Sequence, residues 1–160
     1  EMCIRDRFIS AYVGGDPIHC RNIVCDQKLE RYASVFASDR GLRILALHSW
    51  DPSSHHKLKI VLQRWLEKGL VDVAIGTGPH VAEQVKIIKT PRGAGILATS
   101  LGNFIHPSLS AQSNNVVLKT RWAYQPVNQV LMLKKVATTV VSCDGAVCRR
   151  GATRGLYSEP

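Results

Sequence analysis

Residues 71–81 read V-D-V-A-I-G-T-G-P-H-V, and this stretch decides which fold the chain is expected to adopt. Residues 71–75 form a short apolar run that does not alternate with polar residues, which is typical of a strand buried on both faces of a parallel sheet. The run ends at Gly76, and the turn Gly-Thr-Gly-Pro then leads to a single histidine, His80. Glycine permits a sharp turn and proline stiffens it. We therefore predict a strand followed by a rigid turn that presents an imidazole.

The segments before this stretch predict that the strand has a parallel neighbour. Apolar residues recur at helical spacing from Asp26, a candidate N-cap, to Gly41, and again over residues 54–68. Each helical pattern is followed by a short apolar run, residues 42–47 in the first case and residues 71–75 in the second. The order helix–strand–helix–strand predicts an α/β fold in which two parallel strands are joined by a right-handed crossover.

The remainder of the chain predicts antiparallel strands. Residues 85–89 and 95–100 flank a turn-rich Thr90-Pro-Arg-Gly93 segment, which suits a β-hairpin. Residues 116–124 and 130–141 are rich in β-branched side chains and are again separated by a turn. We therefore expect a parallel strand pair with helices, followed by antiparallel β-strands.

Length and composition limit the organisation of the chain and its partners. With 160 residues, of which 45% are hydrophobic, we expect a single domain over residues 1–150 and a polar, flexible tail over residues 151–160. No apolar run approaches the roughly 20 residues of a transmembrane helix. The formal charge of +9 comes from scattered basic residues that are not interleaved with aromatic ones. This pattern favours an ordinary solvated basic surface; the alternative is a surface that attracts an anionic substrate or polymer, and neither is a specific nucleic-acid site.

The five cysteines follow no zinc-binding spacing. Cys143 and Cys148 flank Asp144-Gly145, a turn signal, so the two thiols either form a disulfide across a small hairpin or remain reduced. A disulfide would favour an exported protein. The sequence leaves both alternatives open.

Two histidines are expected at the same edge of the predicted sheet. His48 directly follows residues 42–47, and His80 follows residues 71–75 and the glycine turn. The carboxyl ends of parallel strands meet at one edge, where α/β proteins bind their ligands, and imidazole is a common ligand of transition metals. We predict that His48 and His80 bind a divalent metal. The alternative is that His48 is a polar cap on the end of its strand and that His80 is a turn residue hydrogen-bonded to the backbone. His55 and His56, at a helix start, are expected to be exposed to solvent.

Three strings support a resemblance to a known family. They are L-A-L-H-S-W-D at residues 45–51, K-G-L-V-D-V-A-I-G-T-G-P-H-V at residues 68–81 and A-T-S-L-G-N-F-I at residues 98–105. Over residues 42–107 the chain resembles the C-terminal half of the poly-γ-glutamate capsule-synthesis (CapA-like) family, a branch of the calcineurin-like metallophosphoesterase superfamily. Family members carry, in the same order, His-Trp-Gly-x-Glu, G-A-D-x-V-I-G-x-x-P-H-V and Y-S-L-G-N-F.

The resemblance implies a four-layer α/β/β/α sandwich with two metal ions, manganese, iron or zinc, at the strand ends. Water activated by the metals would attack a phosphate ester or a related bond. His48 and His80 match metal-ligand histidines of the family, and Asn103 matches the asparagine of its S-L-G-N-F motif. Thr77 stands where the family has another histidine, and Asp51 lies near the position of its glutamate. Thr77, Asn103 and Asp51 are therefore candidate residues lining the site.

The family's other metal ligands, in Asp-x-His and Gly-Asn motifs, have no counterpart in this sequence. The resemblance therefore implies the C-terminal portion of a capsule-biosynthesis protein of the cell envelope or extracellular space. In the full-length parent the segment would be part of a metal-dependent hydrolase that acts within a capsule-synthesis complex. On its own the segment is not expected to be catalytically competent. The alternative function is a non-catalytic envelope module that binds an anionic polymer, which the threonine at position 77 favours.

Overall fold

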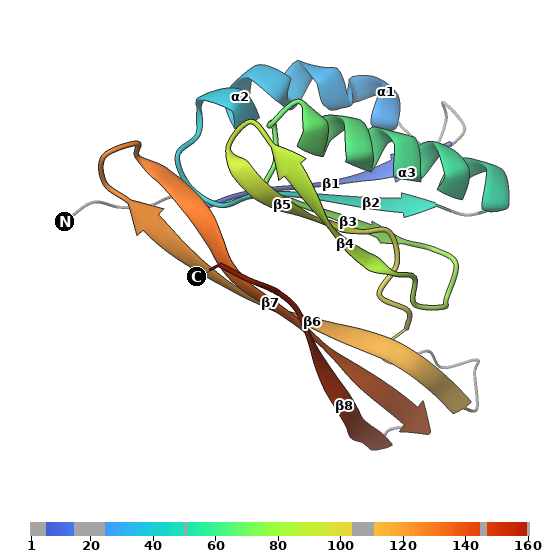
Figure 1. The fold of residues 1–160 in the computed structure, drawn as a ribbon. Coiled ribbons are helices and arrows are strands. Elements are labelled where there is room, and N and C mark those ends of the chain that lie inside the picture. The colour runs from blue at the N-terminus through green and yellow to red at the C-terminus, as the bar shows by residue number, and fades with distance from the viewer. Residues whose placement is uncertain (1–5, 15–24, 50, 104–110, 145–146, 160) are drawn as a thin grey trace.

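The computed structural model describes residues 6–14, 25–49, 51–103, 111–144 and 147–159, and these form three layers (Figure 1). Helices cover one face of a five-stranded sheet, and a three-stranded sheet lies on its other side (Figure 1). The predicted mixed α/β architecture is thus confirmed, with a largely parallel sheet followed by a separate antiparallel one.

The first sheet contains the predicted parallel pair. Its strand order is β1-β2-β3-β5-β4, and every neighbouring pair is parallel except β4 with β5. The hairpin predicted around Thr90–Gly93 is present, and one of its strands, β5, also extends the parallel sheet by pairing with β3. The bounds are β1 Arg7–Val13, β2 Arg43–Ser49, β3 Val73–Thr77, β4 Val85–Thr90 and β5 Gly93–Ala98.

Strand β1 was not predicted. Its sequence, R-F-I-S-A-Y-V, contains a serine and a tyrosine among its apolar residues. In the folded chain Ala11 and Val13 are buried beneath the helices, and β1 pairs with β2 over its whole length. The strand is therefore defined by its neighbour in space, which the local pattern does not reveal.

Helix α3, Pro52–Glu67, forms within two residues of its predicted bounds. Asp51 is its N-cap, because the Asp51 carboxylate accepts hydrogen bonds from the backbone N–H groups of Ser53 and Ser54. The other predicted helix is divided into three short pieces, although Leu29 and Phe36 are buried as its spacing required. The pieces are α1 Asp26–Leu29, η2 Glu30–Tyr32 and α2 Ala33–Ser38. Among the helices that the structure describes, none is long and apolar enough to cross a membrane.

The second sheet corrects the expectation of a flexible tail. Strands β6 (Ala111–Gln125), β7 (Val130–Asp144) and β8 (Val147–Ser158) form an antiparallel sheet in that order. Strand β8 includes most of the segment expected to be mobile. Most of the side chains of β8 are exposed, so its sequence shows no apolar alternation. Its backbone nevertheless pairs with β7. Leu156 and Tyr157 pack against the core between the two sheets.

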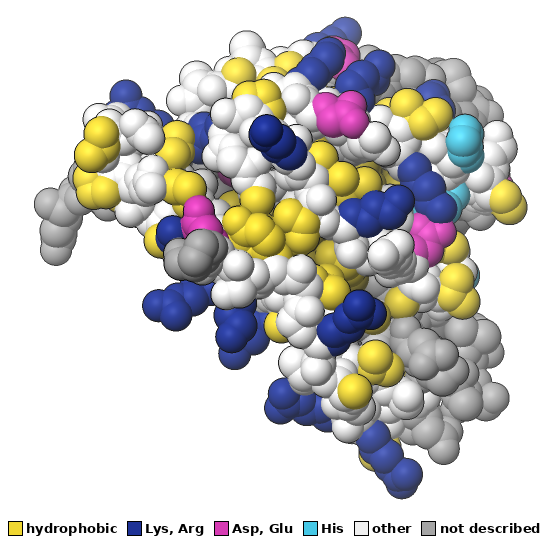
Figure 2. All heavy atoms as spheres, viewed as in Figure 1, with side chains coloured by type: hydrophobic (Ala, Val, Ile, Leu, Met, Phe, Trp, Pro, Cys, Tyr) yellow, Lys and Arg dark blue, Asp and Glu magenta, His cyan; other side chains and the backbone are white. Residues whose placement is uncertain are grey.

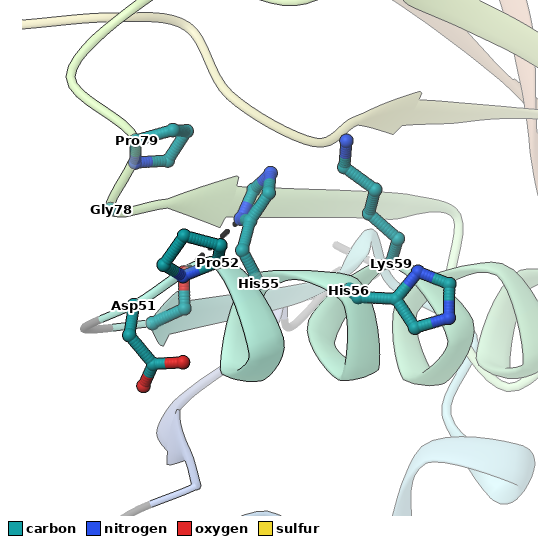
Figure 3. A pocket seen from close by; sticks show the side chains of 8 residues that line it. Asp51, Pro52, His55, His56, Lys59, Gly78 and Pro79 are labelled. Carbon is teal, nitrogen blue, oxygen red and sulfur yellow. Dashed lines mark hydrogen bonds between the residues drawn. The ribbon is translucent and has the colours of Figure 1, made fainter.

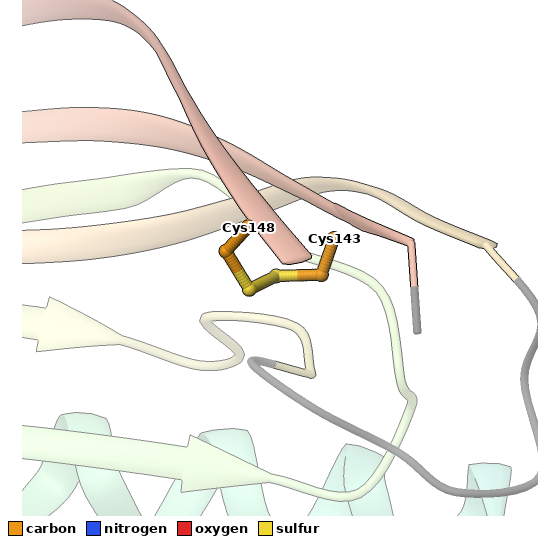
Figure 4. The surroundings of a disulfide bond; sticks show 2 residues. All are labelled: Cys143 and Cys148. Atoms are coloured by element: carbon orange, nitrogen blue, oxygen red, sulfur yellow. A yellow bond between two sulfur atoms is a disulfide. The ribbon is translucent and has the colours of Figure 1, made fainter. Parts of the chain in front are cut away.

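A disulfide bond joins Cys143 of β7 to Cys148 of β8 (Figure 4). It answers the question that the sequence left open, because the two cysteines are paired directly across the strands. The Cα atoms lie 4.1 Å apart, since the antiparallel register brings these residues face to face. The bond holds the end of β7 to the start of β8.

Two hydrophobic clusters separate the three layers. The larger one fills the space between helix α3 and the first sheet and includes Trp65, which is 1% exposed. The smaller one lies between the two sheets, where Ile96 of β5 is in the same cluster as Leu133 and Val136 of β7. The first sheet is therefore covered on both faces, as its short apolar strands predicted.

A buried ion pair connects the starting ends of β2 and β3. Arg43 is 0% exposed and Asp72 is 4% exposed. The guanidinium donates from Nε to Asp72 Oδ2 at 3.0 Å and from Nη2 to Oδ1 at 2.7 Å, while Nη1 donates to the carbonyls of Phe36 and Gly69. The Arg43 backbone N–H also donates to Asp72 Oδ2. One side chain thus joins two strands to the ends of two helical segments.

We expect Arg43→Met to lower the free energy of unfolding by about 3–5 kcal/mol, because it leaves the buried Asp72 carboxylate with only the backbone N–H of residue 43 and the more distant Arg92 Nε, 3.6 Å away. Urea denaturation would measure the loss. Arg64→Met is the matched control. Arg64 Nη2 lies 3.7 Å from Glu30 Oε1 and both side chains are more than half exposed, so this change should lower the free energy of unfolding by less than about 1 kcal/mol. Equal losses in the two variants would contradict the role of the buried pair.

Candidate functional site

The carboxyl ends of three parallel strands place Tyr12, His48 and Thr77 side by side. His48 lies opposite Tyr12 of β1 and opposite Thr77 of β3 in the strand register. The rings of Tyr12 and His48 meet edge to face, with centroids 5.1 Å apart. The imidazole of His48 is therefore held between two neighbours at the edge where the sequence placed it.

A hydrogen bond to Thr77 orients the His48 ring. His48 Nδ1 lies 2.9 Å from Thr77 Oγ1. With the Thr77 hydroxyl directed at the carbonyl of Leu47, 3.4 Å away, the contact suits the tautomer of His48 protonated at Nδ1, in which Nε2 would carry the lone pair. This is the arrangement of a histidine ligand whose second nitrogen is held by a hydrogen bond.

His80 has a similar polar support. Its backbone is left-handed, with a φ angle of 62°, which is uncommon for a residue other than glycine. Its Nδ1 lies 3.0 Å from Asn103 Oδ1, a contact that suits the tautomer protonated at Nδ1, in which Nε2 would carry the lone pair. Asn103 therefore fixes the orientation of His80 as Thr77 fixes that of His48.

His48 and His80 interact electrostatically. Burial lowers the pKa of His48 below its ordinary value, and the charge of His80 lowers it further. The two rings are therefore within electrostatic reach of each other, although they come from different strand ends. A lowered pKa favours the neutral form of His48, which is the form that binds a metal.

Close backbone contacts explain the glycines of the turn. A Cβ atom at Gly76 would overlap the carbonyl of Thr99 and the side chain of Leu58. At Gly78, where φ is 136°, it would overlap the backbone oxygen and the hydroxyl of Ser49. Both glycines thus allow β3 and the following turn to lie directly against neighbouring strands, which positions Pro79 and His80.

The donors around His48 and His80 fit only part of a metal's coordination shell. They comprise two imidazoles, the hydroxyl of Thr77 and the amide of Asn103. Neutral hydroxyl and amide oxygens are weak ligands for transition metals, so the imidazoles are the principal donors. Within the described ranges, no group of three or more His, Cys, Asp or Glu side chains is arranged to hold a metal ion. A complete centre would need further ligands.

Asp51 has a different contact from the one expected. Its carboxylate caps helix α3, and it also accepts a hydrogen bond from Ser54 Oγ at 2.9 Å. Hydrogen bonds from the backbone and the side chain of Ser54 lower the pKa of Asp51. The sequence placed Asp51 near the metal site by resemblance, whereas the structure uses it to begin a helix. Trp50, Phe104 and Ile105, which belong to the same motifs, lie outside the described residues.

A second polar group lies on the helix side of the sheet, beside a cavity of about 450 Å³ (Figure 3). His55 contributes to its wall from α3 and is only 8% exposed, so the expectation that it faces solvent is wrong; His56 is exposed as expected. His55 Nδ1 lies 3.1 Å from Ser49 Oγ, and Figure 3 marks this hydrogen bond. Burial follows because His55 points from the first turn of the helix toward the sheet, where Ser49 is its partner.

Glu83 links this group to the strands. Its carboxylate lies 3.3 Å from His55 Nε2 and accepts hydrogen bonds from Lys59 Nζ at 2.6 Å and from the hydroxyl of Thr99. Burial alone would raise the pKa of Glu83, but the hydrogen bonds from Lys59, Thr99 and His55 outweigh it and lower the pKa to about 2. Glu83 thus fastens the segment after His80 to helix α3 and to the residue that follows β5.

The two groups lie on opposite faces of the first sheet. Along β2, Leu45 and Leu47 belong to the core beneath α3, whereas Ile44 packs in the core between the sheets. Because strand residues alternate, Ser49 faces the helix and His48 faces the second sheet. Sequence reasoning missed the Ser49–His55–Glu83 group, since Glu83 carries no motif and His55 was assigned to solvent.

Comparisons with known proteins do not assign the chain to a family. No protein-family model matches it, and a search of curated proteins gives no significant match.

We expect Glu83→Gln to lower the free energy of unfolding at pH 7 by about 1–3 kcal/mol, because it weakens hydrogen bonds to a charged carboxylate. The folded-state pKa, about 2, is below the ordinary value of 4.5, so this stabilisation is complete above pH 4.5 and is lost as the pH falls through 2. Urea denaturation from pH 7 to pH 2 should show the difference between variant and parent shrinking.

Glu67→Gln is the matched control for this series. Glu67 is exposed and bonds only Gln63 among the described contacts of its side chain, at 2.7 Å. The change should alter the free energy of unfolding by less than about 0.5 kcal/mol. A loss for Glu83→Gln that stays constant between pH 7 and pH 2 would be incompatible with the charged network.

Proposed function

We propose that this chain is the C-terminal portion of a CapA-like protein with a metallophosphoesterase-type site, and that His48 and His80 are two of its metal ligands. The observation that carries the proposal is the matched support of the two imidazoles at the carboxyl edge of the sheet: each ring bonds a polar side chain through Nδ1. The proposal is also supported by the order of the layers, because helices, first sheet and second sheet are compatible with three of the four layers of an α/β/β/α sandwich.

In this proposal the protein's own residues prepare the ligands. Thr77 and Asn103 favour the tautomer in which Nε2 of each ring carries the lone pair, and the buried position of His48 favours its neutral form. A bound manganese, iron or zinc ion would supply an activated water for attack on a phosphate ester. The contribution of this chain is to orient two donors at a fixed strand edge.

The donor set implies that the segment is not a competent hydrolase by itself. A binuclear centre needs more ligands than two imidazoles, and Thr77 occupies the position where the CapA-like family has a further histidine. The remaining ligands would come from another part of the full-length protein. We accordingly propose hydrolytic activity for the parent and a ligand-supplying role for this segment.

The disulfide supports a location in the cell envelope or outside the cell. Disulfides persist in oxidising compartments and are rare in the cytosol, and Cys143 and Cys148 are joined. A capsule-synthesis complex at the cell surface is the setting that the family resemblance implies. The pairing of the cysteines is consistent with that setting.

We expect manganese, iron or zinc ions to raise the thermal unfolding midpoint if the two histidines form a site. At a concentration one hundred times Kd, the stabilisation is about 2.7 kcal/mol, or roughly 5–10 °C for a domain of this size. His48→Ala and His80→Ala should each abolish the shift, whereas His56→Ala, an exposed histidine on α3, should retain it. A shift that survives both site variants, or no shift with any of the metals, would count against the proposal.

Thr77→His should tighten metal binding if position 77 faces the ion, because a third imidazole ligand should outweigh the lost hydrogen bond to His48 Nδ1. A third imidazole at this position should lower Kd about tenfold or more, which isothermal titration with zinc would measure. Asn103→His is a useful comparison, since it replaces the support of His80. If Thr77→His leaves Kd unchanged while the fold is intact, position 77 does not face the bound ion.

A further inference from the structure

The outer surface of the second sheet contains a basic hollow of about 490 Å³. Four cationic side chains line it: Lys119, Arg121, Lys135 and Arg150. They come from all three strands of the sheet, and each is exposed. Figure 2 shows Lys and Arg side chains spread over the part of the molecule that β6, β7 and β8 form.

The strand register explains why a hollow forms between these cations. Lys119 of β6 lies opposite Ala137 of β7, which in turn lies opposite Gly155 of β8, while Arg121 lies opposite Lys135. Small residues thus form the floor, and long cationic side chains rise at one side of it. A Cβ atom at Gly155 would meet nothing within 4 Å, so the space above it is open.

The four cations are not neutralised by the described part of the chain. None of them forms an ion pair with a described residue, whereas Lys134, next to Lys135, is paired with Glu159. Arg150 Nη2 donates to Thr153 Oγ1 at 3.2 Å, and the hydroxyls of Thr139 and Thr153 lie 2.9 Å apart in the same wall. Charged and hydroxyl donors therefore converge on a surface where no described acidic side chain pairs with them.

The lining selects among anionic ligands. Arginine forks and lysines bind phosphate oxygens, and threonine hydroxyls add hydrogen bonds. Single-stranded nucleic acids usually need aromatic rings on which their bases stack, and none of the described residues that line the hollow is aromatic. Trp122 of β6 packs in the core between the sheets. The surface suits closely spaced phosphate charges without bases.

We propose that this hollow, defined by Lys119, Arg121, Lys135 and Arg150, binds a linear polyphosphate-type chain. The strand geometry supports an extended ligand, because cations two residues apart along β6 are roughly 7 Å apart and those on adjacent strands are about 5 Å apart. The site does not depend on His48 and His80, so it holds in the absence of a metal. Its function is to retain a phosphate polymer on the outer sheet.

The test is fluorescence anisotropy with labelled inorganic polyphosphate of defined length, in EDTA, at 50 and 200 mM salt. The double variant Lys119→Ala/Arg121→Ala should weaken binding at least tenfold and reduce the slope of log K against log salt by about 1.5. The matched control is Arg149→Ala/Arg154→Ala, which removes two exposed charges from the same sheet but outside the hollow, and should change Kd less than threefold.

Gly155→Leu tests the hollow without changing charge. Its side chain would occupy the open space, and we expect at least tenfold weaker binding with an unchanged unfolding midpoint. Equal losses in the two double variants, or full binding by Gly155→Leu, would overturn the proposal. Tighter binding of single-stranded DNA or of a polycarboxylate of equal charge would also overturn it. Because EDTA is present, absence of binding refutes this site alone and leaves the metal proposal unaffected.

Discussion

The ion pair between Arg43 and Asp72 is the constraint on which the candidate site depends. It joins the first residue of β2 to the residue before β3, and hydrogen bonds from the same guanidinium reach the carbonyls of Phe36 and Gly69. The two residues are 29 positions apart in sequence, and so are His48 and Thr77. The alignment set at the start of the strands is therefore the alignment that brings His48 to Thr77 at their ends. A buried pair with such specific geometry favours one register over its neighbours.

The sequence predicted the parts of the fold that have strong local patterns. Helix α3, the parallel pair β2–β3 and the β4–β5 hairpin follow from apolar spacing and turn residues, and the edge location of His48 follows from the parallel pair. Strand β8 could not be predicted in this way because most of its side chains are exposed and show no apolar alternation, although it pairs with the neighbouring β7. Strand β1 could not be predicted because it is formed by pairing with a strand distant in the sequence. The Ser49–His55–Glu83 group was missed because its members meet only after the helix packs on the sheet.

The same strand edge supports two chemically different groups, one on each face of the first sheet. Thr77 connects them physically, since its side chain bonds His48 and its carbonyl accepts a hydrogen bond from Ser49 Oγ. Glu83 then fixes the end of the segment that begins at His80. The position of His80 is thus determined from both ends, by the close packing of Gly78 at one end and the Glu83 network at the other.

Strand β8 lies at the border of its sheet, with β7 as its only hydrogen-bonded neighbour among the described strands. A strand in this position offers unpaired amide and carbonyl groups that would otherwise template association with another chain. Arg149, Arg150 and Arg154 place three like charges along this border. Two molecules that approached through β8 would bring those charges together, so electrostatic repulsion protects the exposed border against edge-to-edge aggregation.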